Sequence, residues 1–168
     1  LCDCAHVVGS NQQHCIQSRE YYTQALKEGF GHFFSSKIWN DEAQNNCGFG
    51  YYKEFLNLNN EVEDVPVAFS CRTPHLWRNN NCGKTDRGVE MDWMAFFWSW
   101  HTREDNGGTG SRASMTEILD VLDRARVIDG GSEIHWNSLR QAAENKWGWN
   151  TPKYNNFRYW AEDHGVWN

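Results

Sequence analysis

Several features are missing from this sequence of 168 residues, and each absence excludes a class of protein. Positive charge is not in excess: the formal net charge is −6, which argues against broad electrostatic attraction to nucleic acid or to anionic lipid. No apolar run has membrane-spanning length, because the most apolar segment, 93–100, is short and flanked by charges. We therefore expect neither a nucleic-acid partner nor a membrane.

The chain also lacks an initiator methionine and a signal sequence, since it opens at Leu1. We expect a mature or proteolytic product, or a piece of a longer protein. The sequence has no N-x-Ser/Thr glycosylation site either, which leaves its source open.

Cysteine is absent from the second half and concentrated in the first. The six residues are Cys2, Cys4, Cys15, Cys47, Cys71 and Cys82. An even number in a non-repetitive chain predicts a disulfide framework and a secreted, extracellular protein. Six cysteines allow 15 pairings, and the sequence does not choose among them. The alternative is a zinc knot built from Cys2, Cys4, His6, His14 and Cys15, but its spacing matches no common structural zinc pattern.

The pattern of apolar residues predicts a mainly α fold. We expect one domain over 1–168, with a loop-rich, disulfide-braced first half (1–86), a helical second half (87–168) and few or no strands. The best strand candidate is 65–69, which its proline would confine to a sheet edge. At 168 residues the chain is long enough to bury a real core.

Start and stop signals predict where the helices lie. We expect a first helix from Ser18 to about Trp39 and a buried helix over 89–102 with a narrow polar stripe. Three more helices follow in the second half. They are predicted from a capping box at Ser114 to about Arg126, from Ser132 to Trp147, and from Thr151 to Gly165.

Aromatic residues are abundant, with ten tryptophans and nine phenylalanines. Most of this surface is expected in the core, because aromatic side chains bury a large area each. Core positions are predicted for Trp93, Trp98, Trp136 and Trp160. Exposed positions are predicted for Trp77, Trp147, Trp149 and Trp167. We expect Trp147 and Trp149, which flank Gly148, to offer a stacking surface for a sugar or a protein partner.

The first predicted helix contains an unusual segment, EGFGHFF at 28–34. Each glycine inside a helix costs about 1 kcal/mol relative to alanine, so Gly29 and Gly31 indicate that another helix or a metal site approaches the backbone. Glu28 and His32 lie four residues apart and share one helix face. Both side chains can reach one metal ion, or one can orient the other from a second shell. On spacing alone, a solvated glutamate and a hydrogen-bonded histidine are the simpler interpretation.

The segment from Glu28 to Asn40 resembles the third-ligand helix of gluzincin-type zinc metallopeptidases. The resemblance implies that Glu28 is a zinc ligand and that the two glycines allow close packing against the helix that carries the HExxH motif. His32 stands where some relatives have an acidic second-shell residue, so its role is a departure from the family pattern. No residue of this chain is assigned a catalytic role.

No HExxH occurs in this chain, and no two of its seven histidines stand four residues apart. The resemblance therefore implies histidine ligands and a general base from an upstream segment, or from a separate chain of the same precursor. The function it predicts is the C-terminal portion of a secreted zinc metallopeptidase acting on peptides or proteins. Alone, this chain is expected to be inactive, because a catalytic zinc needs three protein ligands.

The alternative is a non-enzymatic, disulfide-stabilised module that binds carbohydrate or a protein partner through exposed tryptophans. Three weaker constellations remain. His6 and His14 are candidates to complete a metal site with Glu28. Asp163 and His164 suggest an acid–base dyad without an identifiable nucleophile. Glu90 and Asp92 do not face each other at i,i+2, which argues against a glycosidase pair.

Overall fold

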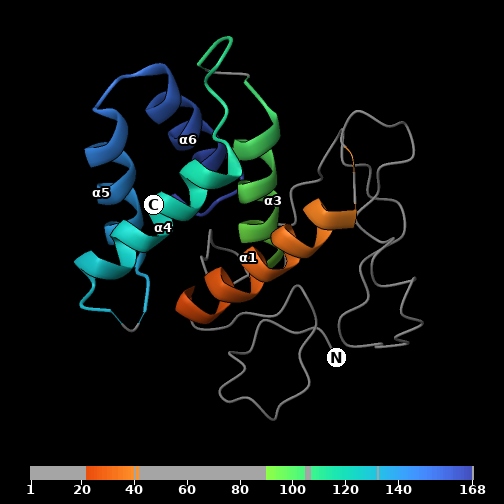
Figure 1. Ribbon diagram of the computed structural model, residues 1–168, viewed down its shortest axis with the longest axis vertical. Coiled ribbons are helices and arrows are strands. Elements are labelled where there is room, and N and C mark those ends of the chain that lie inside the picture. Colours follow the sequence, from red (N-terminus) through yellow and green to blue (C-terminus); the bar gives the residue numbers. More distant parts are fainter. Residues whose placement is uncertain (1–21, 40, 42–89, 105–106, 132, 168) are drawn as a thin grey trace. The chain divides into compact units, whose positions relative to one another are not determined.

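The computed structural model describes residues 22–39, 41, 90–104, 107–131 and 133–167, and these contain five helices and no strand. The helices are α1 (Tyr22–Trp39), α3 (Glu90–Thr102), α4 (Met115–Ile128), α5 (Trp136–Trp147) and α6 (Pro152–Asp163) (Figure 1). The predicted mainly α class is confirmed. All six cysteines, the strand candidate at 65–69, His6, His14 and Trp77 lie outside the described residues. The disulfide-braced first half therefore stays a prediction.

The chain divides into two compact units, 1–95 and 96–168, and the division falls within α3. In the first unit, α1 ends at Trp39 as predicted, while the predicted start at Ser18 lies outside the described residues. One face of α1 is buried through Ala25, Leu26 and Phe33. Phe33 lies two turns after Leu26, and Ala25 is adjacent to Leu26, so the three apolar side chains lie on the same side of the helix.

Helix α3 is buried along nearly its whole length. It begins at Glu90 and ends at Thr102, close to the predicted limits. Every described side chain from 92 to 100 is buried, and these include the polar residues Asp92 and Ser99. Asp92 and Ser99, two residues of the predicted polar stripe, therefore lie inside the protein.

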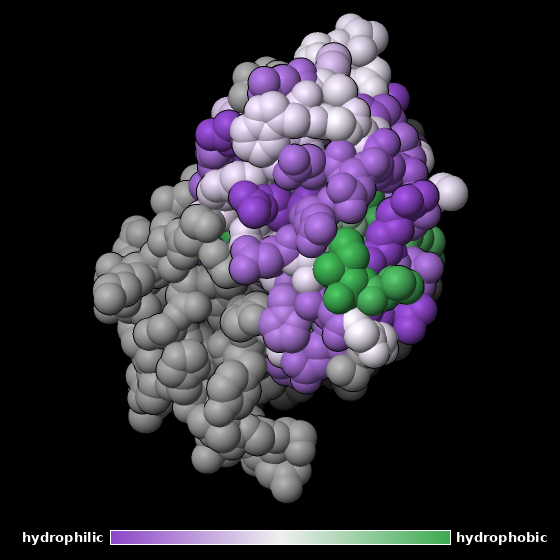
Figure 2. Space-filling view, turned by 90° about the vertical axis from the view of Figure 1, so that its left-hand side faces the viewer, coloured by the Kyte–Doolittle hydropathy of each residue, from purple (hydrophilic) through white to green (hydrophobic). Residues whose placement is uncertain are grey.

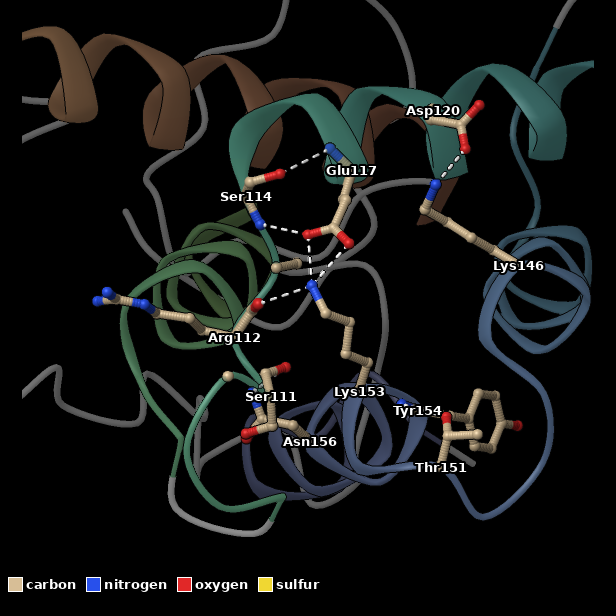
Figure 3. A network of polar contacts seen from close by, with 12 residues as sticks. Ser111, Arg112, Ser114, Glu117, Asp120, Lys146, Thr151, Lys153, Tyr154 and Asn156 are labelled. Atoms are coloured by element: carbon tan, nitrogen blue, oxygen red, sulfur yellow. Dashed lines mark hydrogen bonds and ion pairs between the residues drawn. The ribbon is translucent and has the colours of Figure 1, made fainter.

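In the second unit, α4 begins at the predicted capping box. The Ser114 hydroxyl accepts the backbone N–H of Glu117, and the Glu117 carboxylate accepts the N–H of Ser114. Lys153 of α6 donates to both oxygens of the same carboxylate, at 2.6 and 2.7 Å (Figure 3). One glutamate thus closes the end of α4 and ties it to the start of α6.

Helix α5 packs against both α4 and α6, and its start differs from the prediction. It begins at Trp136, with His135 as N-cap, instead of at Ser132, which lies outside the described residues. The reason is Asp129, whose carboxylate accepts the backbone N–H of His135 at 2.6 Å and the hydroxyl of Ser138 at 2.5 Å. A residue at the end of α4 thus holds the N-cap residue and one side chain in the first turn of α5.

Both predicted limits of α6 are confirmed. Thr151 is the N-cap and accepts the N–H of Tyr154, and Pro152 occupies the first turn. His164 closes the helix, and Gly165 follows with a φ of 74°. A glycine adopts this left-handed conformation without the steric cost that a Cβ would bring.

Aromatic rings fill the core of the second unit around Phe157. Its ring centroid lies 5.0 Å from that of Trp100 and 5.6 Å from that of Phe96, both edge-on. It also stacks on Trp136 at 5.8 Å with an interplanar angle of 3°. Trp93, Trp98, Trp136 and Trp160 are all buried, as predicted.

One face of the described residues is largely hydrophilic (Figure 2). Figure 2 shows polar side chains over most of one face, with a small hydrophobic patch among them. Exposed aliphatic side chains on α4 are Leu119, Val127 and Ile128. Among the described helices, none is both long enough and apolar enough to cross a membrane.

Candidate metal centre

Glu28 lies in the middle of α1 and is half-buried. The side-chain amide of Gln24, one turn earlier, donates a hydrogen bond to its Oε1 at 2.5 Å. An amide donor of this kind orients the carboxylate that accepts it. Carboxylate oxygen is a donor that zinc accepts in catalytic sites, so Glu28 fits the role that the resemblance implies.

Gly29, the next residue, lies against the start of α3. A Cβ built at Gly29 would overlap the backbone carbonyl oxygen of Glu90 and would come within 2.5 Å of the Cβ of Trp93. The approach of a second helix is therefore what requires glycine at this position, and in the described residues that helix is α3. At Gly31 the situation is different, because a Cβ there meets no described atom within 4 Å.

His32 lies beside Glu90, a residue that the sequence pattern did not pair with it. Its Nε2 lies 3.4 Å from Oε2 of Glu90, which is an ion-pair distance when the imidazole is protonated. The side chain of Glu90 is only 1% exposed and that of His32 is 15% exposed. A buried carboxylate is costly to desolvate, so a histidine beside it is a compensating partner.

Sequence reasoning missed this contact because its two residues stand 58 positions apart, with no periodic pattern connecting them. Glu90 was considered only beside Asp92, and Asp92 is itself buried in the structure. A signal did exist in Gly29, since a glycine inside a helix indicates a close neighbour. The sequence alone does not say which neighbour that is.

The described residues supply one candidate zinc donor and no complete ligand set. No group of three or more His, Cys, Asp or Glu side chains within the described ranges is arranged to hold a metal ion. The remaining ligands that the resemblance implies belong to residues outside the described part of the chain or outside the chain itself.

The suggested dyad at Asp163 and His164 proves to have a different neighbour. Nε2 of His164 lies 2.9 Å from the hydroxyl of Ser99 on α3, and the imidazole stacks on Trp160. Both Ser99 and His164 are buried. A serine beside a histidine suggests a nucleophile, but no substrate reaches a pair enclosed in this way, so we read it as a core hydrogen bond.

The tryptophans proposed for stacking divide into two kinds. Trp149 is 50% exposed, on a turn where Gly148 and Asn150 both have positive φ. Trp147 is partly buried, and its ring lies edge-on to Trp100 at 5.6 Å. Trp167 is also partly buried. Of the described tryptophans predicted to be exposed, Trp149 presents the largest free surface.

Charged side chains around α4 have shifted pKa values. Partial burial raises the pKa of Glu117, but hydrogen bonds from Lys153 and Ser114 outweigh it and leave the pKa below 4.5. Burial also raises the pKa of Asp129, and the donors at His135 and Ser138 hold it below 3.8. These shifts belong to groups that connect helices, and we assign them a structural role.

Comparisons with protein-family models, with curated proteins and with solved structures find no match for this chain.

Proposed function

We propose that this chain is the C-terminal portion of a secreted zinc metallopeptidase of gluzincin type, and that Glu28 is one of its zinc ligands. The observation that carries the proposal is the setting of Glu28. Glu28 is a half-buried carboxylate that Gln24 orients. The next residue of α1, Gly29, lies against α3. An upstream segment of the same precursor supplies the histidine ligands and the general base.

In this proposal the chemistry combines Glu28 of this chain with ligands and a general base from the upstream segment. Zinc, when bound, polarises the peptide carbonyl and lowers the pKa of a bound water to about 7. Within this chain, Glu28 contributes a negatively charged ligand, and Gln24 limits how that carboxylate turns. The helical second half of the chain supplies scaffold for a substrate cleft that accepts a peptide or protein.

The test is zinc content and peptidase activity of the complete precursor, compared with its Glu28→Ala variant. We expect the variant to lose both, because removing one of three protein ligands leaves a site that no longer retains the metal. Glu133→Ala is the matched control, since Glu133 is an exposed carboxylate on another part of the chain. Retention of zinc and activity in Glu28→Ala would contradict the proposal.

The exposed ring of Trp149 favours a second candidate, a non-enzymatic module that binds carbohydrate or a protein partner. The ring centroid also lies 5.2 Å from that of Tyr154, so the two rings pack against each other at an interplanar angle of 43°. Binding to a glycan array that Trp149→Ala abolishes would support this candidate. Array binding unchanged by Trp149→Ala would exclude Trp149 as the stacking residue.

A further inference from the structure

Glu28 lies between two restraints on the same face of α1. One turn before it, Gln24 donates to Oε1 of its carboxylate. One turn after it, His32 lies against the buried carboxylate of Glu90 at 3.4 Å. Residues four apart on a helix are neighbours on its surface, so the two restraints bracket Glu28 along a single stripe.

Gly29 adds a third restraint, on the backbone. The peptide at Gly29 lies so close to the Glu90 carbonyl that the space has no room for a Cβ. Two helices in backbone contact cannot roll past each other without a clash, because protein interiors are close-packed. Glu90 thus touches α1 twice, through its carbonyl at Gly29 and through its carboxylate at His32.

These contacts matter because the direction of a metal ligand is set by its surroundings. Ligating carboxylates are commonly held by hydrogen bonds from residues that do not touch the metal, and loss of such partners lowers metal affinity. A small rotation of α1 about its axis would swing Glu28 sideways. The pair of Glu90 and His32 resists that rotation, while Gln24 fixes the carboxylate itself.

We propose that Gln24 and Glu90 are positioning residues for Glu28, with Gln24 acting directly on the carboxylate and Glu90 acting through His32 and Gly29. The inference rests on the proposed function, since it needs Glu28 to be a ligand. In this proposal His32 connects the Glu90 carboxylate to the turn of α1 that contains Glu28.

The experiment measures zinc affinity of the complete precursor by competition with a chelator, together with the thermal midpoint of the zinc-free protein. The two test variants are Gln24→Met, which keeps the size of the side chain but removes the donor, and Glu90→Gln, which keeps the shape but removes the charge. We expect each to weaken zinc binding about tenfold to hundredfold. Thr23→Ala, at the adjacent position of α1, is the control and should leave zinc affinity unchanged.

The Gln24→Met variant separates positioning from stability. Gln24 is exposed, so Gln24→Met should leave the midpoint of the zinc-free protein unchanged while zinc affinity falls. If Glu90→Gln fails to fold, Gln24→Met still decides the matter, because the Gln24 side chain lies on the surface.

The outcomes distinguish this inference from the proposed function. If Glu28→Gln loses zinc while Gln24→Met and Glu90→Gln stay within about twofold of the wild type, the positioning roles are wrong and the ligand assignment stands. If Glu28→Gln keeps its zinc, both proposals fail together. A fall in the thermal midpoint of zinc-free Gln24→Met that accompanies the loss of affinity would also overturn the positioning role of Gln24, because a merely structural role changes both.

Discussion

In the unit that contains α1, the described helices meet through a glycine and a buried acid, whereas α4, α5 and α6 pack around an aromatic core and have ends fixed by caps and partly exposed ion pairs. Gly29 and Glu90 act across a long stretch of sequence. Ser114 and Glu117 act within one turn, and Asp129 reaches only from one helix to the next. Local signals thus determine the ends of the later helices, while non-local contact determines which face of α1 is covered.

The largest expected effect lies on the α1 side of this comparison. Gly29→Ala should lower the free energy of unfolding by about 1–3 kcal/mol, because the new methyl group overlaps the Glu90 carbonyl and the Trp93 side chain. Gly31→Ala is the matched change and should raise it by about 0.5–1 kcal/mol, because the position is open and alanine favours the helix.

Chemical denaturation of the two variants beside the wild type measures both changes. Equal effects of the two substitutions would mean that α1 and the start of α3 are not in contact at Gly29. The comparison is sharp because both substitutions add the same methyl group to the same helix, two residues apart.

A smaller effect is expected on the α4 side, from the charge of Glu117. Its pKa in the folded protein lies below the ordinary value of 4.5, so its ionised form is favoured in the folded state. The resulting stabilisation is present above pH 4.5 and is lost as the pH falls through the lowered pKa. The second unit should therefore become less stable in acid.

Glu117→Gln separates the charge from the cap, because glutamine still accepts the N–H of Ser114 in a capping box. At pH 7 the variant should be less stable by up to about 1 kcal/mol, since it loses the ion pair with Lys153. As the pH falls through the lowered pKa of Glu117, the two proteins should converge. Denaturation midpoints over a pH series from 7 downward test this, and a difference that stays constant over the series would contradict it.

Much of the second unit was predictable from sequence because its signals are short-range. The capping box at Ser114, the Thr151–Pro152 start and the Gly165 end each lie within a few residues of the helix end they determine. The burial of Trp98, Trp136 and Trp160 also followed from their helical spacing. The predicted start of α5 was too early, because the backbone N–H of the N-cap His135 donates to Asp129 at the end of the preceding helix.

The candidate site was predictable only in part. Residue type and spacing singled out Glu28 and His32. The two glycines indicated a close neighbour, which the structure shows at Gly29. The sequence carried no sign that Glu90 is the residue beside His32, or that Ser99 is the residue beside His164. Both pairs join positions more than fifty residues apart, and such pairs depend on how whole helices pack.

By itself, the sequence determined the mainly α class, most helix ends and the aromatic character of the core, because propensity, capping and periodicity act over one or two turns. Only the tertiary structure decided which of the two glycines in α1 requires the absence of a side chain, and that Glu90 lies against His32. The physical reason is that close packing and the pairing of buried charge depend on distances in space, which residues far apart in the chain acquire only when it folds.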